Sequence, residues 1–393
     1  MEEHIKVSKR RFLWDVFMCS LGSYGGPEAH YGVFSSILVQ KRKYLTEEEL
    51  TEMIGLYALV PGPSSSQTIT AIGYYVGGPL LAFLTFLVWA FPAIIIMALV
   101  GVFFTQISNN KTWEPILTYL PAAAVAFIIY AALTLGKKIL KKRYDWILYL
   151  IMLGLGLWLV PYSMWVVPLM LVTGGLISLF PYRKEHEKSD SKLKPKWHIL
   201  GIVVGLALVN ELLRINLGGA FIWLYTSFYR YGYSVIGGGQ IVIPLMIQDL
   251  VNTQGLITLN DFLAGYAIDQ AIPGPLFSFA AFVGSRSFAA ANYSLFAGII
   301  GGLSIFLPGI LLVFFIFPIW KKSREIHLMK YFLKGVTITA AALILMTAIT
   351  QSIKLPVDYV VYLVVGVSTL LLLTKKIPAP LIILLAALLG FLV

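Results

Sequence analysis

Long apolar stretches recur along the chain, separated by short polar segments. Three of the longest are Pro79–Gln106, Pro115–Gly136 and Leu295–Trp320, each long enough to cross a lipid bilayer as a helix. Their apolar residues do not alternate with polar ones, as the strands of a membrane barrel would require. Because backbone polar groups in lipid must bond within their own segment, these stretches predict an all-α polytopic membrane protein.

Other apolar stretches are interrupted near their centres by glycine and proline. Phe12–Gln40 is broken at Gly25-Gly26-Pro27, and Leu50–Val76 is broken at Pro61-Gly62-Pro63. Proline lacks an N–H donor and glycine favours non-helical backbone angles, so we expect two half-helices around each break. Each broken stretch then becomes a re-entrant hairpin that enters and leaves the membrane on the same side.

The same order of features occurs twice along the chain. Three features of the first half have counterparts 212 residues later: the glycine break at Gly25, a threonine with an acidic residue three positions on (Thr46 and Glu49), and Pro61-Gly62-Pro63. The counterparts are Gly237-Gly238-Gly239, Thr258 with Asp261, and Pro273-Gly274-Pro275. This ordered set predicts duplicated halves. We expect a first repeat over residues 1–181, a basic linker over 182–197 and a second repeat over 198–393.

Basic residues orient these segments in the membrane. With a cytoplasmic N-terminus and re-entrant hairpins, 25 of the 30 lysines and arginines fall on the cytoplasmic side, in line with the positive-inside tendency. An additional span at 198–213 reverses the second half, so we expect inverted repeats, an arrangement common among secondary transporters. The full spans are expected near 80–106, 115–136, 145–160, 163–180, 198–213, 295–319, 331–352, 357–374 and 378–393.

Composition and charge narrow the class of protein. Charged residues make up 12% of the 393 residues and the mean hydropathy is +0.82, whereas soluble domains carry about 25% charged residues. The net charge of +11 is expected from basic loops beside membrane helices rather than from nucleic-acid binding. Cys19 is the single cysteine, and neither His-Glu-x-x-His nor a Walker sequence occurs. We therefore expect no cofactor, no metal and no enzymatic activity.

A polar run, Ser64-Ser65-Ser66-Gln67, follows the first Pro-Gly-Pro. A half-helix that starts inside the membrane presents unpaired backbone N–H groups and a positive dipole end, which suit an anion. The three hydroxyls and the amide add donors, whereas the second Pro-Gly-Pro is followed only by Ser278. We predict an anion site between Pro61-Gly62-Pro63 and Pro273-Gly274-Pro275. The alternative is that both triplets only kink packed helices.

The glycine-rich breaks and two arginines complete the predicted binding residues. Gly25-Gly26-Pro27 and Gly237-Gly238-Gly239 are included because each opens a half-helix. Arg230 and Arg286 lie within the broken-helix region of the second half, where a guanidinium could bind an oxyanion through two hydrogen bonds. For Arg286, a position at the membrane interface fits equally well.

Three ionisable residues beside the breaks are candidates to carry a coupling proton: Glu28, His30 and Asp269. His30 also fits a structural role, in which it caps or bonds a broken helix. Asp15 and Glu211 lie near the ends of apolar stretches, and we expect them to face headgroups or water.

In these residues the chain resembles the chromate transporter family in its long, two-domain form. The resemblance covers nearly the whole chain and implies export of chromate, a tetrahedral dianion similar to sulfate, across the cytoplasmic membrane by means of an ion gradient. Two positions depart from the family pattern, because Tyr44 stands where tryptophan is frequent and no asparagine follows Pro63. The matching residues are Gly25-Gly26-Pro27-Glu28-Ala29-His30, Lys41-Arg42-Lys43, Leu45, Pro61-Gly62-Pro63, Gly237-Gly238-Gly239, Pro244, Pro273-Gly274-Pro275, Gly284 and Phe306-Leu307-Pro308.

Two other functions fit the same architecture. One is a carrier of sulfate or another anion, and the other is an anion channel, since channel filters also use broken helices. Saturable, gradient-driven flux far below channel rates would indicate a carrier. The expected partners are chromate or a sulfate-like oxyanion, a coupling ion such as the proton and the lipid bilayer, with no nucleic acid. A homodimer is left open.

Overall fold

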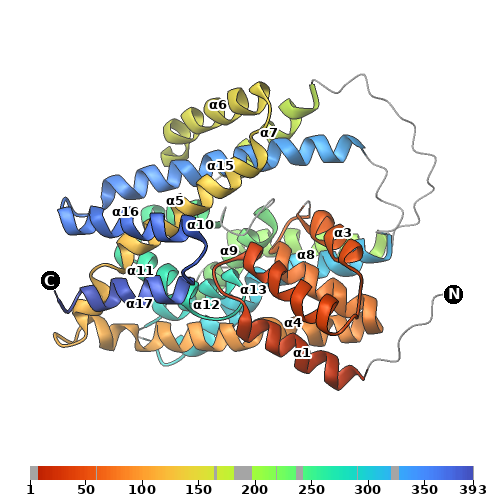
Figure 1. The fold of residues 1–393 in the computed structure, drawn as a ribbon, viewed down its shortest axis with the longest axis horizontal. Helices are drawn as coiled ribbons and strands as arrows, with labels where there is room; N and C mark the ends of the chain where they lie inside the picture. The colour runs from red at the N-terminus through yellow and green to blue at the C-terminus, as the bar shows by residue number, and fades with distance from the viewer. Residues whose placement is uncertain are drawn as a thin grey trace. The chain divides into compact units, whose positions relative to one another are not determined.

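The computed structural model describes residues 8–58, 60–162, 166–180, 197–217, 219–235, 242–289, 291–319 and 327–392. Within these ranges the chain forms helices and no strand (Figure 1). Six helical segments there are long and apolar enough to span a membrane: Ser64–Ser108, Glu114–Ile139, Arg143–Tyr162, Ile199–Asn216, Ser294–Ile316 and Lys334–Lys354. The structure therefore confirms an all-α polytopic membrane protein. Residues 182–196 of the predicted linker, together with Gly237, Gly238 and Gly239, lie outside the described residues.

The first half opens with two broken helix pairs, as the glycine and proline positions predict. Helix α1 ends at Gly22 and α2 begins at Pro27, while α3 ends at Tyr57 and α4 begins at Ser64. Non-helical angles at Gly77 and Gly78 divide α4 into a half-helix and a span. The elements are α1 (Lys9–Gly22), α2 (Pro27–Phe34), the π-helix η1 (Ser35–Lys41), α3 (Glu47–Tyr57), α4 (Ser64–Ser108), η2 (Glu114–Leu117), α5 (Leu120–Ile139), α6 (Arg143–Leu159), η3 (Val160–Tyr162) and α7 (Val166–Leu179).

The second half repeats this element order after an additional helix, α8 (Trp197–Asn216). The π-helices η1 and η6 begin at residues 35 and 247, α3 and α11 at 47 and 259, and α4 and η7 at 64 and 276, so each pair lies 212 residues apart. The elements are α9 (Ala220–Ser234), α10 (Val242–Met246), η6 (Ile247–Thr253), α11 (Leu259–Ala271), η7 (Leu276–Ser278), α12 (Phe279–Ser287), α13 (Ser294–Ile316), η8 (Phe317–Ile319), α15 (His327–Lys354), α16 (Tyr359–Thr374) and α17 (Ala379–Leu389). The duplicated pattern is thus present in the structure as well as in the sequence.

Local sequence explains where the half-helices start. Gly26 precedes α2 with φ of 99°, a conformation that glycine adopts at little cost, and Pro27 occupies the first turn, where its missing N–H does no harm. Thr46 forms a capping box with Glu49 at the start of α3. Thr258 accepts the backbone N–H of Asp261 at the start of α11 in the same way.

The chain divides into two compact units, and each takes segments from both halves of the sequence. Unit 1 comprises the described residues of Met1–Val102, Ser191–Val235 and Ile272–Arg324. Unit 2 comprises those of Phe103–Asp190, Ile236–Ala271 and Glu325–Val393. Both Pro-Gly-Pro triplets, between which the anion site is predicted, belong to unit 1.

Unit 2 is organised around α15, which packs against α5, α6 and α7. Gly174 of α7 and Gly335 of α15 allow these two helices to approach closely, since a Cβ added at either position would strike the facing helix. Asp145 at the start of α6 is buried and accepts a 2.6 Å bond from Lys334 of α15. The same carboxylate accepts the backbone N–H groups of Lys141 and Lys142, which anchors the start of α6.

Candidate anion-binding site

The two Pro-Gly-Pro triplets are held by reciprocal backbone hydrogen bonds. Gly62 donates its N–H to the carbonyl of Val235 at 2.7 Å, and Gly274 donates its N–H to the carbonyl of Ser23 at 2.8 Å. Ser23 and Val235 are themselves 212 residues apart, so the two bonds join equivalent positions of opposite halves. Each triplet is therefore fixed to the end of the first half-helix of the other repeat.

Backbone geometry and packing both require glycine at these positions. Gly62 has φ of 123° and Gly274 has φ of 132°. Residues that carry a Cβ rarely adopt backbone angles in this region. A Cβ on Gly62 would lie 2.8 Å from Cα of Gly309, and one on Gly274 would lie 2.5 Å from Cβ of Ala93. The close approach that Gly62 permits is thus made by the backbone of α13, and its N–H is bonded to Val235.

The first turn of α4 carries the densest group of buried hydroxyls near the triplets. Ser64 accepts a bond from the Tyr31 hydroxyl at 3.1 Å, and Ser66 accepts one from the indole N–H of Trp89 at 3.0 Å. Both serines are buried, and because each accepts from its aromatic partner, each retains its own O–H as a donor. The aromatic partners therefore orient the two hydroxyls at the helix start.

His30 belongs to the same group. Its Nδ1 lies 3.0 Å from Oγ of Ser65, and its ring meets that of Trp89 edge-on at 5.3 Å between centroids. The imidazole is buried, and Nε2 has no hydrogen-bond partner among the described residues. Whichever nitrogen carries the proton, the pair has one donor to offer: either Nε2–H of His30 or the hydroxyl of Ser65.

Gln67 lies at the end of the first turn of α4 and links this turn to α13 of the second repeat. Its Nε2 donates to the carbonyls of Pro61 at 2.8 Å and of Gly309 at 3.0 Å, which fixes the orientation of the amide. The sequence-based prediction treats this amide as a donor to the anion, but both of its N–H groups point to backbone carbonyls. Its Oε1 is buried and has no partner among the described residues.

The other predicted binding residues do not all lie near the two triplets along the chain. Gly25 and Gly26 lie in the break between α1 and α2, and Pro27 begins α2; Gly25 stands two residues after Ser23, whose carbonyl accepts the N–H of Gly274. Buried Ser278 stands at the start of α12, whereas half-buried Arg286 lies eight residues further on, about 12 Å along the helix axis. The prediction therefore joins residues from opposite ends of α12.

Arg230 and the coupling candidates His30 and Asp269 lie on three different helices, α9, α2 and α11. Arg230 is buried on α9, five residues before Val235, and its guanidinium lies 5.7 Å from the ring of Tyr231. Asp269 is buried on α11 in unit 2. The side chain of Glu28 is outside the described set. Among the three coupling candidates, His30 is the one with a described contact to the first turn of α4.

The sequence predicts that Asp15 faces headgroups or water, and this prediction is wrong: Asp15 is buried. It accepts two bonds from Arg42 at 2.8 and 3.0 Å and one from the Tyr44 hydroxyl at 2.6 Å. The pKa of Tyr44 is raised to about 12, mainly by burial and to a smaller extent by the bond to Asp15. The hydrogen bond to the same carboxylate raises the pKa of Arg42. The hairpin returns Arg42 and Tyr44 to the start of α1, a proximity that linear spacing does not reveal.

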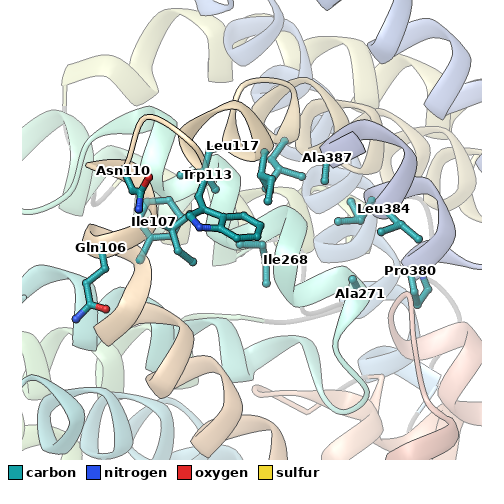
Figure 2. A pocket seen from close by; sticks show the side chains of 14 residues that line it. Gln106, Ile107, Asn110, Trp113, Leu117, Ile268, Ala271, Pro380, Leu384 and Ala387 are labelled. Carbon is teal, nitrogen blue, oxygen red and sulfur yellow. The ribbon is translucent and has the colours of Figure 1, made fainter. Parts of the chain in front are cut away.

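A groove of about 860 Å³ lies in unit 2, and none of the predicted site residues lines it. Figure 2 shows Gln106 and Asn110 at one end, with Trp113, Leu117, Ile268 and Leu384 along its length. Its lining is mostly apolar and carries no charged side chain, and the N–H donors it has are those of Gln106, Asn110 and Trp113, so it suits a dianion poorly.

Several contact residues of the site were not singled out by the sequence. Tyr31 directly follows His30 and Gly309 directly follows Pro308, and both His30 and Pro308 are among the residues that carry the family resemblance, so Tyr31 and Gly309 had a signal of position. Trp89 lies in an uninterrupted apolar run and carried none. Its role depends on α4 folding back at Gly77 and Gly78.

Comparison with known proteins relates both halves of the chain to a single family of transporters. The family model described as chromate transporter matches residues 10–179 and again residues 222–391, two segments that start 212 residues apart. An uncharacterized transporter of Methanocaldococcus jannaschii is 24% identical, over 100% of this chain and 96% of its own length. A probable chromate transport protein of Synechococcus elongatus is 25% identical, over 93% and 91%. A chromate transport protein of Cupriavidus metallidurans is 24% identical, over 93% and 88%. No solved structure matches the chain.

Proposed function

Because the chain belongs to the chromate transporter family, we propose that it exports chromate across the cytoplasmic membrane as a secondary active carrier coupled to a proton gradient. The observation that carries this proposal is the family match, which covers both halves and includes both Pro-Gly-Pro triplets. Relatives named as chromate transport proteins align over most of the chain. The chain is a multi-pass membrane protein of a transporter family, and the substrate, its direction and the coupling ion are the proposed part.

The oxyanion is proposed to bind between Pro61–Pro63 and Pro273–Pro275 in unit 1. The hydroxyls at the start of α4 support this position, since they are buried and keep O–H donors beside a helix N-terminus. The N–H groups of Gly62 and Gly274 hold the breaks together, so the side-chain donors and the following helix turns are the proposed ligands.

Arg230 and Arg286 are proposed to balance the negative charge of the substrate. Replacing either arginine with Gln is expected to weaken chromate binding, and the Lys variant should restore it only in part, because an ammonium cannot copy the guanidinium fork. Arg230 is the stronger candidate, since it lies about 7 Å along α9 from Val235, the partner of Gly62. Wild-type affinity in both folded Gln variants would assign the arginines to structure.

His30 is proposed to carry the coupling proton. It is supported by its contact with Ser65, through which a change of protonation would alter the donors offered to the anion. A His30→Gln variant should bind chromate but lose the dependence of flux on a pH gradient. If that variant keeps the dependence, Glu28 or Asp269 takes its place.

Inverted topology of the two repeats is also proposed. The reciprocal bonds support it, because contacts in which position i meets position j of the other copy and j meets i are typical of a twofold relation. With the additional helix α8 between the repeats, the twofold axis would lie in the membrane plane.

Transport by purified protein in proteoliposomes tests the function. Uptake of chromate, sulfate, molybdate and phosphate is measured with and without an imposed pH gradient, against protein-free vesicles. We expect saturable chromate flux that the gradient accelerates. A preference for sulfate would identify a different anion carrier, and non-saturating flux at channel rates would contradict the carrier mechanism.

A further inference from the structure

A second groove, of about 680 Å³, lies in unit 1 along the outer face of α1. One end is basic and the remainder is apolar, in an order that follows the helix from its first turn onward. Its lining includes Arg10, Arg11, Leu13, Trp14, Phe17 and Val88. The groove shares no residue with the proposed anion site.

The apolar part presents a large aromatic surface that the protein leaves uncovered. The side chain of Trp14 is 60% exposed and lies beside Phe17, with 5.6 Å between ring centroids. The distance from Arg10 to Phe17 along the helix is about 10 Å, which matches the upper part of a lipid acyl chain. In a multi-pass membrane protein, such a surface faces hydrocarbon.

The basic part adds a positive charge at the start of the helix. Arg10 and Arg11 are exposed, and no described residue forms an ion pair with either. The carboxylate of Asp15, on the same helix, is buried and bonded to Arg42 and Tyr44 rather than paired with Arg10 or Arg11. The positive end of the α1 dipole acts in the same direction as the two guanidinium groups.

From this charge complementarity we propose that the groove binds one anionic phospholipid. The phosphate would contact Arg10 and Arg11, which bind phosphate oxygens through paired N–H donors. One acyl chain would lie along Leu13, Trp14, Phe17 and Val88. The proposal does not depend on the transported substrate, so it can fail or succeed independently of chromate transport.

Native mass spectrometry of the delipidated full-length protein tests the proposal. Phosphatidylglycerol and phosphatidylcholine are added separately at equal concentrations, and we expect wild type to retain phosphatidylglycerol preferentially. The Arg10→Gln/Arg11→Gln variant should bind it roughly 20- to 30-fold more weakly, about fivefold for each charge near the membrane surface. Binding of phosphatidylcholine should weaken much less, because its choline offsets the charge of the phosphate. Trp14→Ala should weaken the binding of both lipids.

The matched control is Lys375→Gln/Lys376→Gln, which removes the same charge from exposed positions in unit 2 and should leave lipid retention unchanged. Equal retention of both lipids by wild type would overturn the proposal. The same follows if the arginine variant keeps wild-type affinity, or if the lysine control loses as much. Complete competition by soluble glycerol phosphate would indicate a phosphate site and also contradict it. If the double variant does not fold, the wild-type comparisons decide alone.

Discussion

At the residue scale, Gly62 shows how packing and conformation combine at one position. Its φ of 123° excludes most residues, and the Cα of Gly309 occupies the space where a Cβ would stand. The N–H that a bare helix start would offer to a ligand instead binds Val235. A Pro-Gly-Pro triplet in the sequence predicts a break in the helix, but it does not indicate which group fills that break.

Gly62→Ala is expected to destabilise the protein by about 1–3 kcal/mol, the cost of holding a non-glycine residue in this region. Thermal unfolding in detergent measures the effect. Gly55→Ala is the matched control, because a Cβ there meets nothing within 4 Å and alanine favours the helix. Equal melting temperatures for Gly62→Ala and wild type would show that the break adjusts without strain.

The hydroxyls of Ser64, Ser65 and Ser66 are expected to bind the oxyanion directly. Replacing all three with Ala should weaken chromate and sulfate binding together, because a hydrogen bond to a charged group contributes about 1.5–3 kcal/mol, or about tenfold to a hundredfold in affinity. Calorimetry on the folded variant measures this loss.

The control for the serine variant lies one turn further along α4. Thr68 and Thr70 donate their hydroxyls to the carbonyls of Ser64 and Ser66, so Thr68→Val/Thr70→Val removes hydroxyls that are already occupied. This control should keep wild-type affinity for both anions. If the triple-alanine variant also keeps it, the binding site lies elsewhere.

At the element scale, the two equivalent hairpins share a π-helix but are held by different side-chain contacts. Both contain a seven-residue π-helix at the same register, a deviation that is frequent at functional positions. In the first hairpin Arg42 and Tyr44 bind Asp15 of α1. The equivalent positions of the second repeat are Gln254, Leu256 and Ser227, which cannot form this ionic cluster. The first hairpin belongs to unit 1, whereas η6 and α11 belong to unit 2.

Asp15→Asn is expected to loosen the first hairpin, because it leaves Arg42 and Tyr44 without their anionic acceptor. The melting temperature should fall by several degrees, and amide hydrogen exchange should rise in residues 41–46. Asp358→Asn serves as control, since Asp358 caps α16 at Val360 and asparagine is an equally good cap. Unchanged exchange in residues 41–46 would show that the hairpin is held by other contacts.

The helix breaks could be predicted from glycine and proline, since these residues impose local backbone constraints. The threonine caps at Thr46 and Thr258 were predictable for the same reason. The partners of the site were not, because Trp89, Gly309 and Val235 reach it only through the fold. The burial of Asp15 was missed because its partners stand about 30 residues away in sequence and no periodic pattern links them.

At the scale of the whole molecule, each of the nine expected spans overlaps a described helix, with boundaries that differ by a few residues in most cases. Six of them lie in helices long and apolar enough to cross a membrane, whereas α7, α16 and α17 are shorter apolar helices. Hydropathy sets these spans, because apolar length is what the bilayer selects. The division into two units that interleave the halves could not be read from the sequence, since it depends on contacts between helices distant in the chain.

The topology predicts which loops are reachable from each side of the membrane. In a variant with Cys19 replaced by Ala, a cysteine at Lys111 should react with an impermeant reagent from outside, and cysteines at Lys41 or Lys375 should react only from the cytoplasm. Cys19 is the single native cysteine, so its replacement leaves the introduced cysteine as the one thiol that can react. Labelling of Lys41 from outside, or of Lys111 from the cytoplasm, would contradict re-entrant hairpins.

The reciprocal bonds of Gly62 and Gly274 bear on how such a chain could have arisen. Neither repeat alone contains the acceptor for its own glycine, and an unbonded N–H in a membrane interior costs several kcal/mol. A half-length ancestor would therefore have needed a second copy to complete its centre. Fusion of two such copies turns a meeting of separate chains into an intramolecular step at high effective concentration. Once two copies are joined, equivalent positions can differ, and here Ser64, Ser65 and Ser66 correspond to Leu276, Phe277 and Ser278.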